Sequence, residues 1–252
     1  MEALREKFGH LRGITLNALA PARGKLMDFG SGAGHFAAAQ AKLGWDVVAL
    51  DPYSSASNAA QNARVSENHI ELLYPDNSFD AITLWYVIEH LQNPAQALEE
   101  FYRVLKPNGI LVLAQQDFGS LQARMFGQNW LFLDPPRHLW QFTASSLEAL
   151  AAQKGFALKT VSWATLEMSP FCMLQSALNV IVGNNNDLFK FLKNNKLPKD
   201  SKGYNSARAR PWAVLASVAL LPVLGPLTLL AYFVLLAFKQ GDIFTLYLEK
   251  RP

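Results

Sequence analysis

The feature that most constrains this chain is a short apolar segment that runs into a cluster of glycines and then into a helix-length segment. Residues 26–29 read Leu-Met-Asp-Phe, residues 30–34 read Gly-Ser-Gly-Ala-Gly, and His35 begins the helical pattern. Glycines in such a turn let a ligand approach the backbone, and the first helical turn offers free N–H donors. Asp51 ends the next apolar run, where a carboxylate can accept both hydroxyls of a ribose. The pattern predicts a nucleoside site on an α/β sheet.

The spacing of the glycines also limits the kind of nucleoside. A dinucleotide site favours a third glycine three residues after the second, because it allows close packing over a pyrophosphate. His35 holds that position here, and no phosphate-binding lysine follows the glycines. We therefore expect a nucleoside ligand without a phosphate chain, and His35 disfavours a nicotinamide-dependent oxidoreductase.

Short apolar runs alternate with helix-length segments between residues 25 and 163, as a doubly wound α/β sheet requires. Strands are predicted at 25–29, 46–51, 69–73, 80–85, 109–115 and 157–163, and helices at 34–43, 55–64, 94–105 and 144–154. Thr143 is a suitable N-cap for the last helix and Gly155 a suitable stop. A further strand pattern at 241–250 predicts that the sheet resumes after an insertion.

Composition excludes several classes of protein. Half of the residues are apolar and 17% are charged, which excludes a disordered chain. Cys172 is the single cysteine, so disulfide frameworks and cysteine-based zinc sites are excluded. The net charge of +3 is too small to indicate a nucleic-acid partner. The N-terminal segment 1–24 is expected to be helical, and its charged start lacks the apolar centre of a secretory signal, so a cytoplasmic location is expected.

The insertion at 166–240 has an apolar and basic composition. Residues 168–186 carry no charge, and residues 187–210 hold seven Lys or Arg against two Asp, a segment charge of +5. Residues 211–238 form a second uncharged run, which Pro222, Gly225 and Pro226 interrupt. The arm 227–238 would reach only about 18 Å, less than a hydrocarbon core of about 30 Å. Two short helices forming a hairpin are therefore predicted.

The topology of the insertion favours a membrane anchor that does not cross the bilayer. The strands at 157–163 and 241–250 belong to one predicted sheet, so the insertion must return to its starting side. Lys and Arg near an anionic leaflet contribute about 1 kcal/mol each. We expect peripheral or monotopic attachment to anionic lipids on the cytoplasmic face. The alternative is that these helices pack on the protein or form a dimer interface.

Four blocks in order resemble the class I S-adenosylmethionine-dependent methyltransferases. They are 27–34 (MDFGSGAG), 48–52 (VALDP), 77–82 (NSFDAI) and 105–111 (LKPNGIL). The resemblance covers roughly 20–165 and 241–252, and it implies S-adenosylmethionine as cofactor and a seven-stranded Rossmann-like sheet whose last strand is antiparallel. The predicted domains are a methyltransferase core of residues 25–165 and 241–252 and an insertion of residues 166–240. The residues implied at the cofactor are Asp28, Gly30, Ser31, Gly32, Gly34, His35, Asp51, Pro52, Tyr53 and Trp85.

Two later blocks resemble the branch that methylates small-molecule and quinone-like hydroxyls. They are 85–91 (WYVIEHL) and 136–139 (PRHL), and the candidate catalytic residues there are His138, His90 and Glu89. His138 follows an aromatic, proline-rich loop that is expected at the carboxyl ends of the strands, where it could act as a general base. The alternative is that His138 is a structural loop histidine. His90, too, could have a structural role as a hydrogen-bonding residue. The candidate substrate contacts are Tyr86, Trp130, Phe132 and Arg137.

No metal is predicted, because Tyr86 stands where some quinone O-methyltransferases have a further acid. Methyl transfer from a sulfonium chiefly requires alignment of the reactants and exclusion of water. The apolar insertion favours O-methylation of a lipophilic acceptor, such as a prenylated phenol or a lipid-linked glycan. The alternatives are a tethered methyltransferase with a soluble acceptor and a non-catalytic scaffold that binds S-adenosylmethionine. The sequence does not indicate an oligomeric state.

Overall fold

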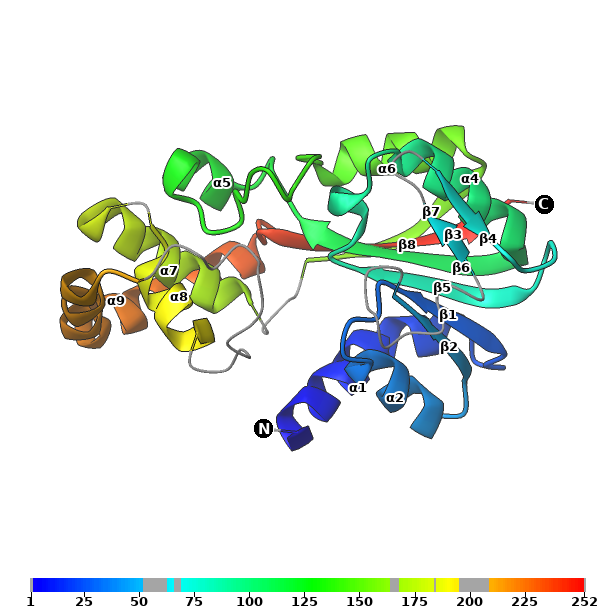
Figure 1. Cartoon of the computed structure of the whole chain (residues 1–252), viewed down its shortest axis with the longest axis horizontal. Coiled ribbons are helices and arrows are strands. Elements are labelled where there is room, and N and C mark those ends of the chain that lie inside the picture. The colour runs from blue at the N-terminus through cyan, green and yellow to red at the C-terminus, as the bar shows by residue number, and fades with distance from the viewer. Residues whose placement is uncertain are drawn as a thin grey trace. The chain divides into compact units, whose positions relative to one another are not determined.

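The computed structural model describes residues 2–51, 63–65, 69–163, 168–183, 185–194 and 209–251. The chain divides into two compact units. The sheet unit comprises 1–116, 137–162 and 244–252, and the helical unit comprises 117–136 and 163–243 (Figure 1). The segment 117–136 was expected in the core and instead belongs with the insertion.

The sheet unit is built on a six-stranded sheet in the order β2-β1-β5-β6-β8-β7. The strands are β1 (Lys25–Phe29), β2 (Asp46–Leu50), β5 (Phe79–Trp85), β6 (Leu105–Gln116), β7 (Phe156–Ser162) and β8 (Ile243–Lys250). β1 runs parallel to β2 and β5, and β5 runs parallel to β6, whereas β7 and β8 are antiparallel. The central strands are apolar on both faces, as expected for parallel strands covered by helices. The doubly wound sheet with an antiparallel last pair is confirmed.

Helices cover both faces of this sheet (Figure 1). α1 (Glu2–Leu19) packs against α2 (His35–Lys42) on one face, and α4 (Pro94–Val104) and α6 (Ala144–Gln153) cover the other. The side chain of Asn93 caps α4 by accepting the Gln96 N–H, and Pro94 occupies the first turn. Thr143 and Ser146 form a reciprocal capping box at α6, which confirms the predicted cap.

The predicted third strand does not join the main sheet, so the described sheet has six strands instead of seven. β4 (Ile70–Leu72) pairs with β3 (Ala63–Val65) in a separate antiparallel hairpin. Side chains of α4 form hydrogen bonds with the backbone of β4. Gln96 accepts the Ile70 N–H at 2.8 Å, and Glu100 accepts the Leu72 N–H at 2.8 Å. The backbone of β4 is thereby satisfied without a neighbouring strand of the main sheet. The helix predicted at 55–64 lies mostly outside the described residues, and its end, 63–64, is strand.

The helical unit contains α5 (Leu121–Phe126), α7 (Ser169–Val182), α8 (Asp187–Asn194) and α9 (Pro211–Ala237). α9 packs against α7 and α8. Arg210 links the start of α9 to the end of α7, because its guanidinium donates to the carbonyls of Val182 and Gly183 at 3.1 and 3.2 Å. The same guanidinium pairs with the buried Asp187 at 2.6 Å.

The hairpin predicted around Pro222 and Pro226 is wrong, because α9 is a single helix of 27 residues. Each proline removes one N–H donor, and the remaining ladder continues through both. The Thr228 hydroxyl donates to the carbonyls of Leu224 at 2.7 Å and Gly225 at 3.2 Å, just after the second proline. At 1.5 Å per residue, 27 residues reach about 40 Å. Among the described residues, α9 is the helix long and apolar enough to cross a membrane by length and composition.

Candidate active site

A glycine turn joins β1 to α2. Gly30, Gly32 and Gly34 have φ angles of +77°, +53° and +72°, a region that side chains rarely adopt. A Cβ on Gly30 would lie 2.3 Å from the Val87 side chain, so this glycine is needed for packing. A Cβ on Gly32 or Gly34 would meet no described atom within 4 Å. The backbone at these two glycines is therefore open to a ligand.

The predicted ribose carboxylate lies against this glycine turn. Asp51, directly after β2, accepts the Gly32 N–H with its Oδ2 at 2.9 Å. Gly34 is the left-handed N-cap of α2, and its N–H donates to the Ser31 carbonyl at 2.9 Å. His35 follows with an exposed side chain in the first turn of the helix, where partial positive charge favours an anionic group. Pro52 and Tyr53 lie outside the described residues.

Asp28 supplies a buried carboxyl next to the turn. The Thr83 hydroxyl donates to its Oδ1 at 2.9 Å. Burial raises the pKa of Asp28 to about 7, while Thr83 and Arg12 favour the charged form and Asp51 opposes it. A cation bound nearby would therefore stabilise the ionised carboxyl.

Arg12 was missed by the sequence analysis. Its guanidinium carbon lies 5.2 Å from the centre of the Trp85 ring and 5.5 Å from that of Tyr86. The Trp85 ring also lies 5.1 Å from the Phe36 ring at the start of α2. Arg12 thus places a positive charge near Asp28 and the end of β5, where it can bind a carboxylate. The only local signal was a basic residue in an N-terminal helix, which is common on solvated helices.

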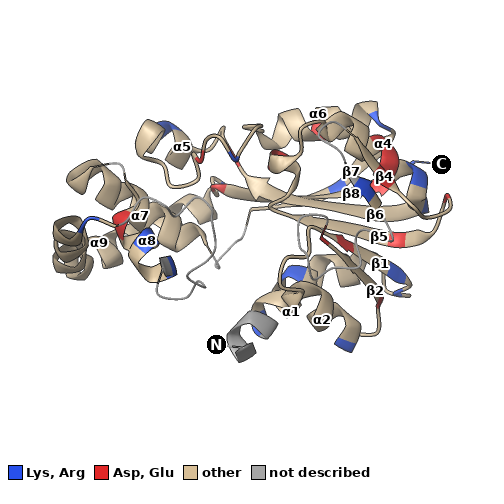
Figure 2. Ribbon diagram, viewed as in Figure 1, with Lys and Arg blue, Asp and Glu red and all other residues tan. Residues whose placement is uncertain are grey.

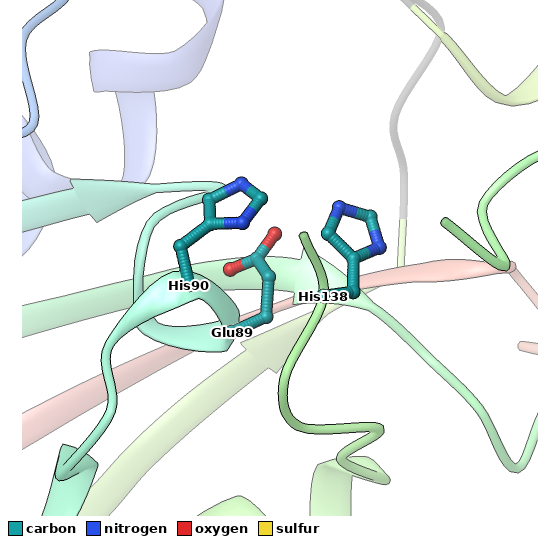
Figure 3. A group of neighbouring side chains, drawn as sticks. All are labelled: Glu89, His90 and His138. Atoms are coloured by element: carbon teal, nitrogen blue, oxygen red, sulfur yellow. The ribbon is translucent and has the colours of Figure 1, made fainter. Parts of the chain in front are cut away.

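A group of three proton-accepting side chains lies next to the glycine turn. Val87, which contacts Gly30, directly precedes the short helix η1 (Ile88–His90). Glu89 and His90 come from η1, His138 comes from the loop after Arg137, and one ligand atom from each lies within 4.8 Å of the others. Figure 3 shows the Glu89 carboxylate between the two imidazole rings. All three predicted catalytic residues are therefore brought together.

The backbone of Glu89 holds the second loop in place. The N–H groups of Leu139 and Trp140 donate to the Glu89 carbonyl at 2.9 and 3.3 Å. The Trp140 indole N–H donates to the Leu91 carbonyl at 2.8 Å. These bonds attach the loop that carries His138 to η1.

The Glu89 carboxylate is strongly desolvated. Glu89 is 1% exposed, and neither carboxylate oxygen has a hydrogen-bond partner in the described part of the chain. Burial raises the pKa of Glu89 to about 7. The Glu89 backbone N–H and the Gln116 side chain lie near enough to favour the charged form, but neither reaches a carboxylate oxygen in hydrogen-bonding geometry. An unpaired buried carboxylate is costly and indicates a missing cationic or hydrogen-bonding partner.

The imidazole of His90 is fixed by the backbone. His90 Nδ1 lies 2.8 Å from the Arg137 carbonyl oxygen, which can only accept, so Nδ1 carries a proton; in the neutral ring Nε2 then presents the lone pair. The rings of His90 and His138 have centres 4.9 Å apart and are tilted by 47°. His90 is thus oriented by the loop that carries His138.

The predicted substrate contacts separate into two sets. Tyr86 lies at the end of β5 with a φ of +60°, and the Arg137 side chain is exposed, both in the sheet unit. Trp130 and Phe132 are buried in the helical unit, with ring centres 5.6 Å apart. The Ser176 hydroxyl of α7 accepts the Leu131 N–H between them at 2.9 Å. The structure therefore places Trp130 and Phe132 in the packing of α7, whereas the predicted cofactor residues that it describes belong to the sheet unit.

These features define a class of protein. A parallel sheet carries a glycine turn after β1, an acid after β2 and a polar group after β5, all at the carboxyl ends of the strands where α/β sheets bind ligands. The open glycines, the Asp51 carboxylate and the first turn of α2 fit a nucleoside that carries an amino acid. This is the arrangement expected of a class I S-adenosylmethionine-dependent methyltransferase.

Comparison with known proteins identifies the family. Residues 4–161 match the methyltransferase domain family, and the chain belongs to that family. The malonyl-acyl-carrier-protein O-methyltransferase of Yersinia pestis is 31% identical over 122 residues, which are 46% of this chain and 45% of that protein. The ubiquinone biosynthesis O-methyltransferase of Rhodopseudomonas palustris is 26% identical over 159 residues, 58% of this chain and 62% of that protein. The chain spans about half the length of the curated relatives it matches.

Solved structures share the fold at low identity. A SAM-dependent methyltransferase from Archaeoglobus fulgidus superposes with a TM-score of 0.54 at 14% identity, covering 98% of this chain and 94% of that one. A cyclase superposes with a TM-score of 0.53 at 17% identity, covering 98% and 80%. The fold alone therefore does not decide the reaction. The family and the site residues indicate S-adenosylmethionine as the cofactor.

Proposed function

We propose that this protein is an S-adenosylmethionine-dependent O-methyltransferase whose acceptor is a lipophilic, membrane-associated hydroxyl compound. The observation that carries the proposal is the contact between Gly30 and Val87. It joins the glycine turn, where the cofactor is expected, to the group formed by Glu89, His90 and His138. A cofactor cradle directly beside groups that can accept a proton is what methyl transfer to a hydroxyl requires.

The chain's own residues can hold each part of the cofactor. The open backbone at Gly32 and Gly34 accommodates its centre, Asp51 the ribose, and Arg12 with Asp28 the carboxylate and ammonium of the methionine part. When bound, S-adenosylmethionine supplies an activated methyl group on a positively charged sulfur. The protein then has to orient the acceptor oxygen and exclude water.

The acceptor hydroxyl must lose its proton, and the three-residue group provides the means. His138 is the proposed base, because it comes from a loop fixed to η1 and adjoins the buried Glu89. Replacing one such base lowers turnover by about 10²- to 10⁴-fold. Two curated relatives are named as O-methyltransferases, of malonyl-acyl-carrier-protein and of ubiquinone biosynthesis, and another is named as a C-methyltransferase of quinone biosynthesis. The choice of oxygen as the acceptor atom is therefore part of the proposal.

The exposed face of α9 supports a membrane-associated acceptor. Residues 211–238 contain no charge, and in Figure 2 α9 has no blue or red along its length. Leu215 and Leu230 are 72% and 64% exposed. In the most apolar stretch of the helix only 11% of the residues are buried. A long helix with so many exposed apolar side chains marks an interaction surface. Lys239, just after the end of the helix, favours anionic headgroups, whereas the charge of Arg210 at its start is paired with Asp187.

The charges at the start of α9 support an in-plane helix over a spanning one. If α9 crossed the bilayer, the basic segment 187–210, which includes the paired Asp187 and Arg210, would have to lie on the far side. The end of α7, which Arg210 binds, would have to move with it. α7 has 14 residues and reaches about 21 Å, too short for a hydrocarbon core of about 30 Å. We infer a peripheral or monotopic attachment on the cytoplasmic face.

Flotation with liposomes tests the membrane part of the proposal. The wild-type protein should float with vesicles that contain anionic lipid, and the double variant Leu215→Glu with Leu230→Glu should stay at the bottom of the gradient. Leu11→Glu is the matched control, since Leu11 is 54% exposed but lies on α1 of the sheet unit. Equal flotation of all three proteins would contradict attachment through α9.

The in-plane orientation has its own test. Cys172 is the only cysteine and is buried, and Gly225 would lie near the middle of the bilayer if α9 crossed it. A Trp212→Cys variant instead places one thiol at the start of α9, where Trp212 is 58% exposed and which crossing would carry to the far side. A membrane-impermeant reagent enclosed within sealed vesicles should not label this thiol when the protein is added outside. Labelling from the enclosed side would show that α9 crosses the bilayer.

A further inference from the structure

We propose that Glu89, His90 and His138 form a binding site for one divalent transition-metal ion, which no other finding assigns to this chain. The sequence predicts no metal, because Tyr86 stands where some quinone O-methyltransferases have a further acid. The structure instead supplies the third ligand from His138, in a loop distant in sequence. The inference concerns metal binding, and only its catalytic consequence rests on the proposed function.

The first support is geometric. One ligand atom from each residue lies within 4.8 Å of the other two. A zinc-like ion about 2.1 Å from three ligands needs them about 3.4 Å apart, so the ligand atoms have to approach one another by at most about 1.4 Å. His138 is half-buried on a loop, and rotation of its side chain can supply this movement. Glu89 can stay in place between the two rings (Figure 3).

The second support is the Glu89 carboxylate, which indicates a ligand independently of the spacing. Glu89 is 1% exposed, and both of its oxygens are buried without a hydrogen-bond partner among the described residues. An ionised carboxylate in this position needs a cation or a donor to offset its desolvation. A metal ion between Glu89 and the imidazoles would provide that charge.

The third support is the tautomer of His90. Metal-bound imidazoles commonly donate their other N–H to a carbonyl or carboxylate, which fixes the ring and leaves the ligating nitrogen free. His90 Nδ1 donates to the Arg137 carbonyl at 2.8 Å, so Nε2 is left with its lone pair. The acceptor belongs to the residue just before His138, so one short segment supplies both a ligand and the group that orients another.

The donor set selects the kind of ion. Two imidazole nitrogens and one carboxylate oxygen suit Zn²⁺, Co²⁺, Fe²⁺ or Mn²⁺, whereas Mg²⁺ and Ca²⁺ prefer oxygen ligands. Three protein ligands leave at least one coordination position for another oxygen. A hydroxyl bound there would have a lowered pKa and could release its proton to water. With the ion bound, His138 is a ligand; without it, His138 remains the proposed base.

Cobalt provides a direct probe that needs no acceptor. The purified full chain is treated with a chelator, dialysed and titrated with Co²⁺, while visible absorption and titration calorimetry are recorded. We expect one Co²⁺ per chain with the absorption of a low-coordinate nitrogen and oxygen site, and competition by Zn²⁺. His138→Ala and Glu89→Gln should weaken the affinity by at least about 10- to 100-fold, the loss typical of removing even an outer partner of a metal ligand. His69→Ala is the matched control, because His69 is exposed and lies outside the group.

The variants also separate the possible failures. His138→Ala changes a half-buried loop residue, so it keeps the test valid even where Glu89→Gln does not fold. Absence of Co²⁺ binding by the wild type, or equal binding by His138→Ala and His69→Ala, would overturn the metal site. Release of S-adenosylhomocysteine is measured separately. Methyl transfer without Co²⁺ binding would refute only the metal site, and Co²⁺ binding without methyl transfer would refute only the proposed function.

Discussion

The buried carboxyl of Asp28 makes a quantitative prediction about stability and pH. In the folded chain burial raises the pKa of Asp28 from 3.8 to about 7. A tenfold change in proton affinity is worth about 1.4 kcal/mol, so ionising Asp28 at high pH costs about 4 kcal/mol of folding free energy. Asp28→Asn removes this cost, and its Oδ1 can still accept the Thr83 hydroxyl.

The direction of the change in stability with pH follows from the protons bound by the folded and unfolded chains. Between about pH 4 and pH 7 the folded chain keeps the Asp28 proton that the unfolded chain releases, so the contribution of Asp28 to stability falls as pH rises through this window. The free energy of unfolding of Asp28→Asn should match that of the wild type near pH 4 and exceed it increasingly, by up to about 4 kcal/mol at pH 8. Other buried carboxyls are present in both proteins and cancel in the difference.

Urea unfolding of both proteins at several pH values, without cofactor, measures this difference. Asp80→Asn is a control of opposite sign, since desolvation of Asp80 is outweighed by Lys106 and the Lys25 N–H, which together lower its pKa. Loss of that carboxylate should destabilise the protein at pH 7. A difference between Asp28→Asn and wild type that does not change with pH, or that favours the wild type as pH rises, would refute the reasoning.

Three further predictions concern the site. Asp51→Ala should weaken S-adenosylmethionine binding about 10- to 150-fold in calorimetry, because hydrogen bonds to a charged group are worth about 1.5–3 kcal/mol; unchanged affinity would remove Asp51 from the site. Gly32→Val should abolish cofactor binding, since the φ of +53° is strained for a branched residue and its side chain would enter the open side of the turn; retained binding by a folded variant would disprove the glycine cradle. His138→Ala should lower the release of S-adenosylhomocysteine by about 10²- to 10⁴-fold while the cofactor dissociation constant stays nearly constant; full turnover would exclude His138.

The local parts of the site could be predicted from the sequence. The glycine turn with Asp51 depends on residues close to the ends of two neighbouring strands, and the parallel pairing of β1 with β2 brings them together. Glu89 and His90 are adjacent in sequence. Such patterns fix their own geometry once the sheet forms, which is why short segments identified them.

The parts that depend on distant packing could not be predicted. Arg12 reaches Trp85 only because α1 packs against α2. The aromatic pattern at Trp130 and Phe132 is typical of both a pocket and a core, and the structure buries both side chains in the helical unit. The two prolines of α9 were read as a break, although a long helix can lose two donors and continue.

The proposed reaction is transfer of a methyl group from S-adenosylmethionine to a lipophilic hydroxyl compound. The most direct measurement is incubation of the purified full chain with methyl-labelled S-adenosylmethionine and a membrane extract of the host, followed by mass spectrometry of the lipid phase. We expect an O-methylated lipid that carries the label, formed together with an equal amount of S-adenosylhomocysteine and absent with the Gly32→Val variant. Cofactor binding without S-adenosylhomocysteine release in any extract, or label confined to water-soluble products, would contradict the account.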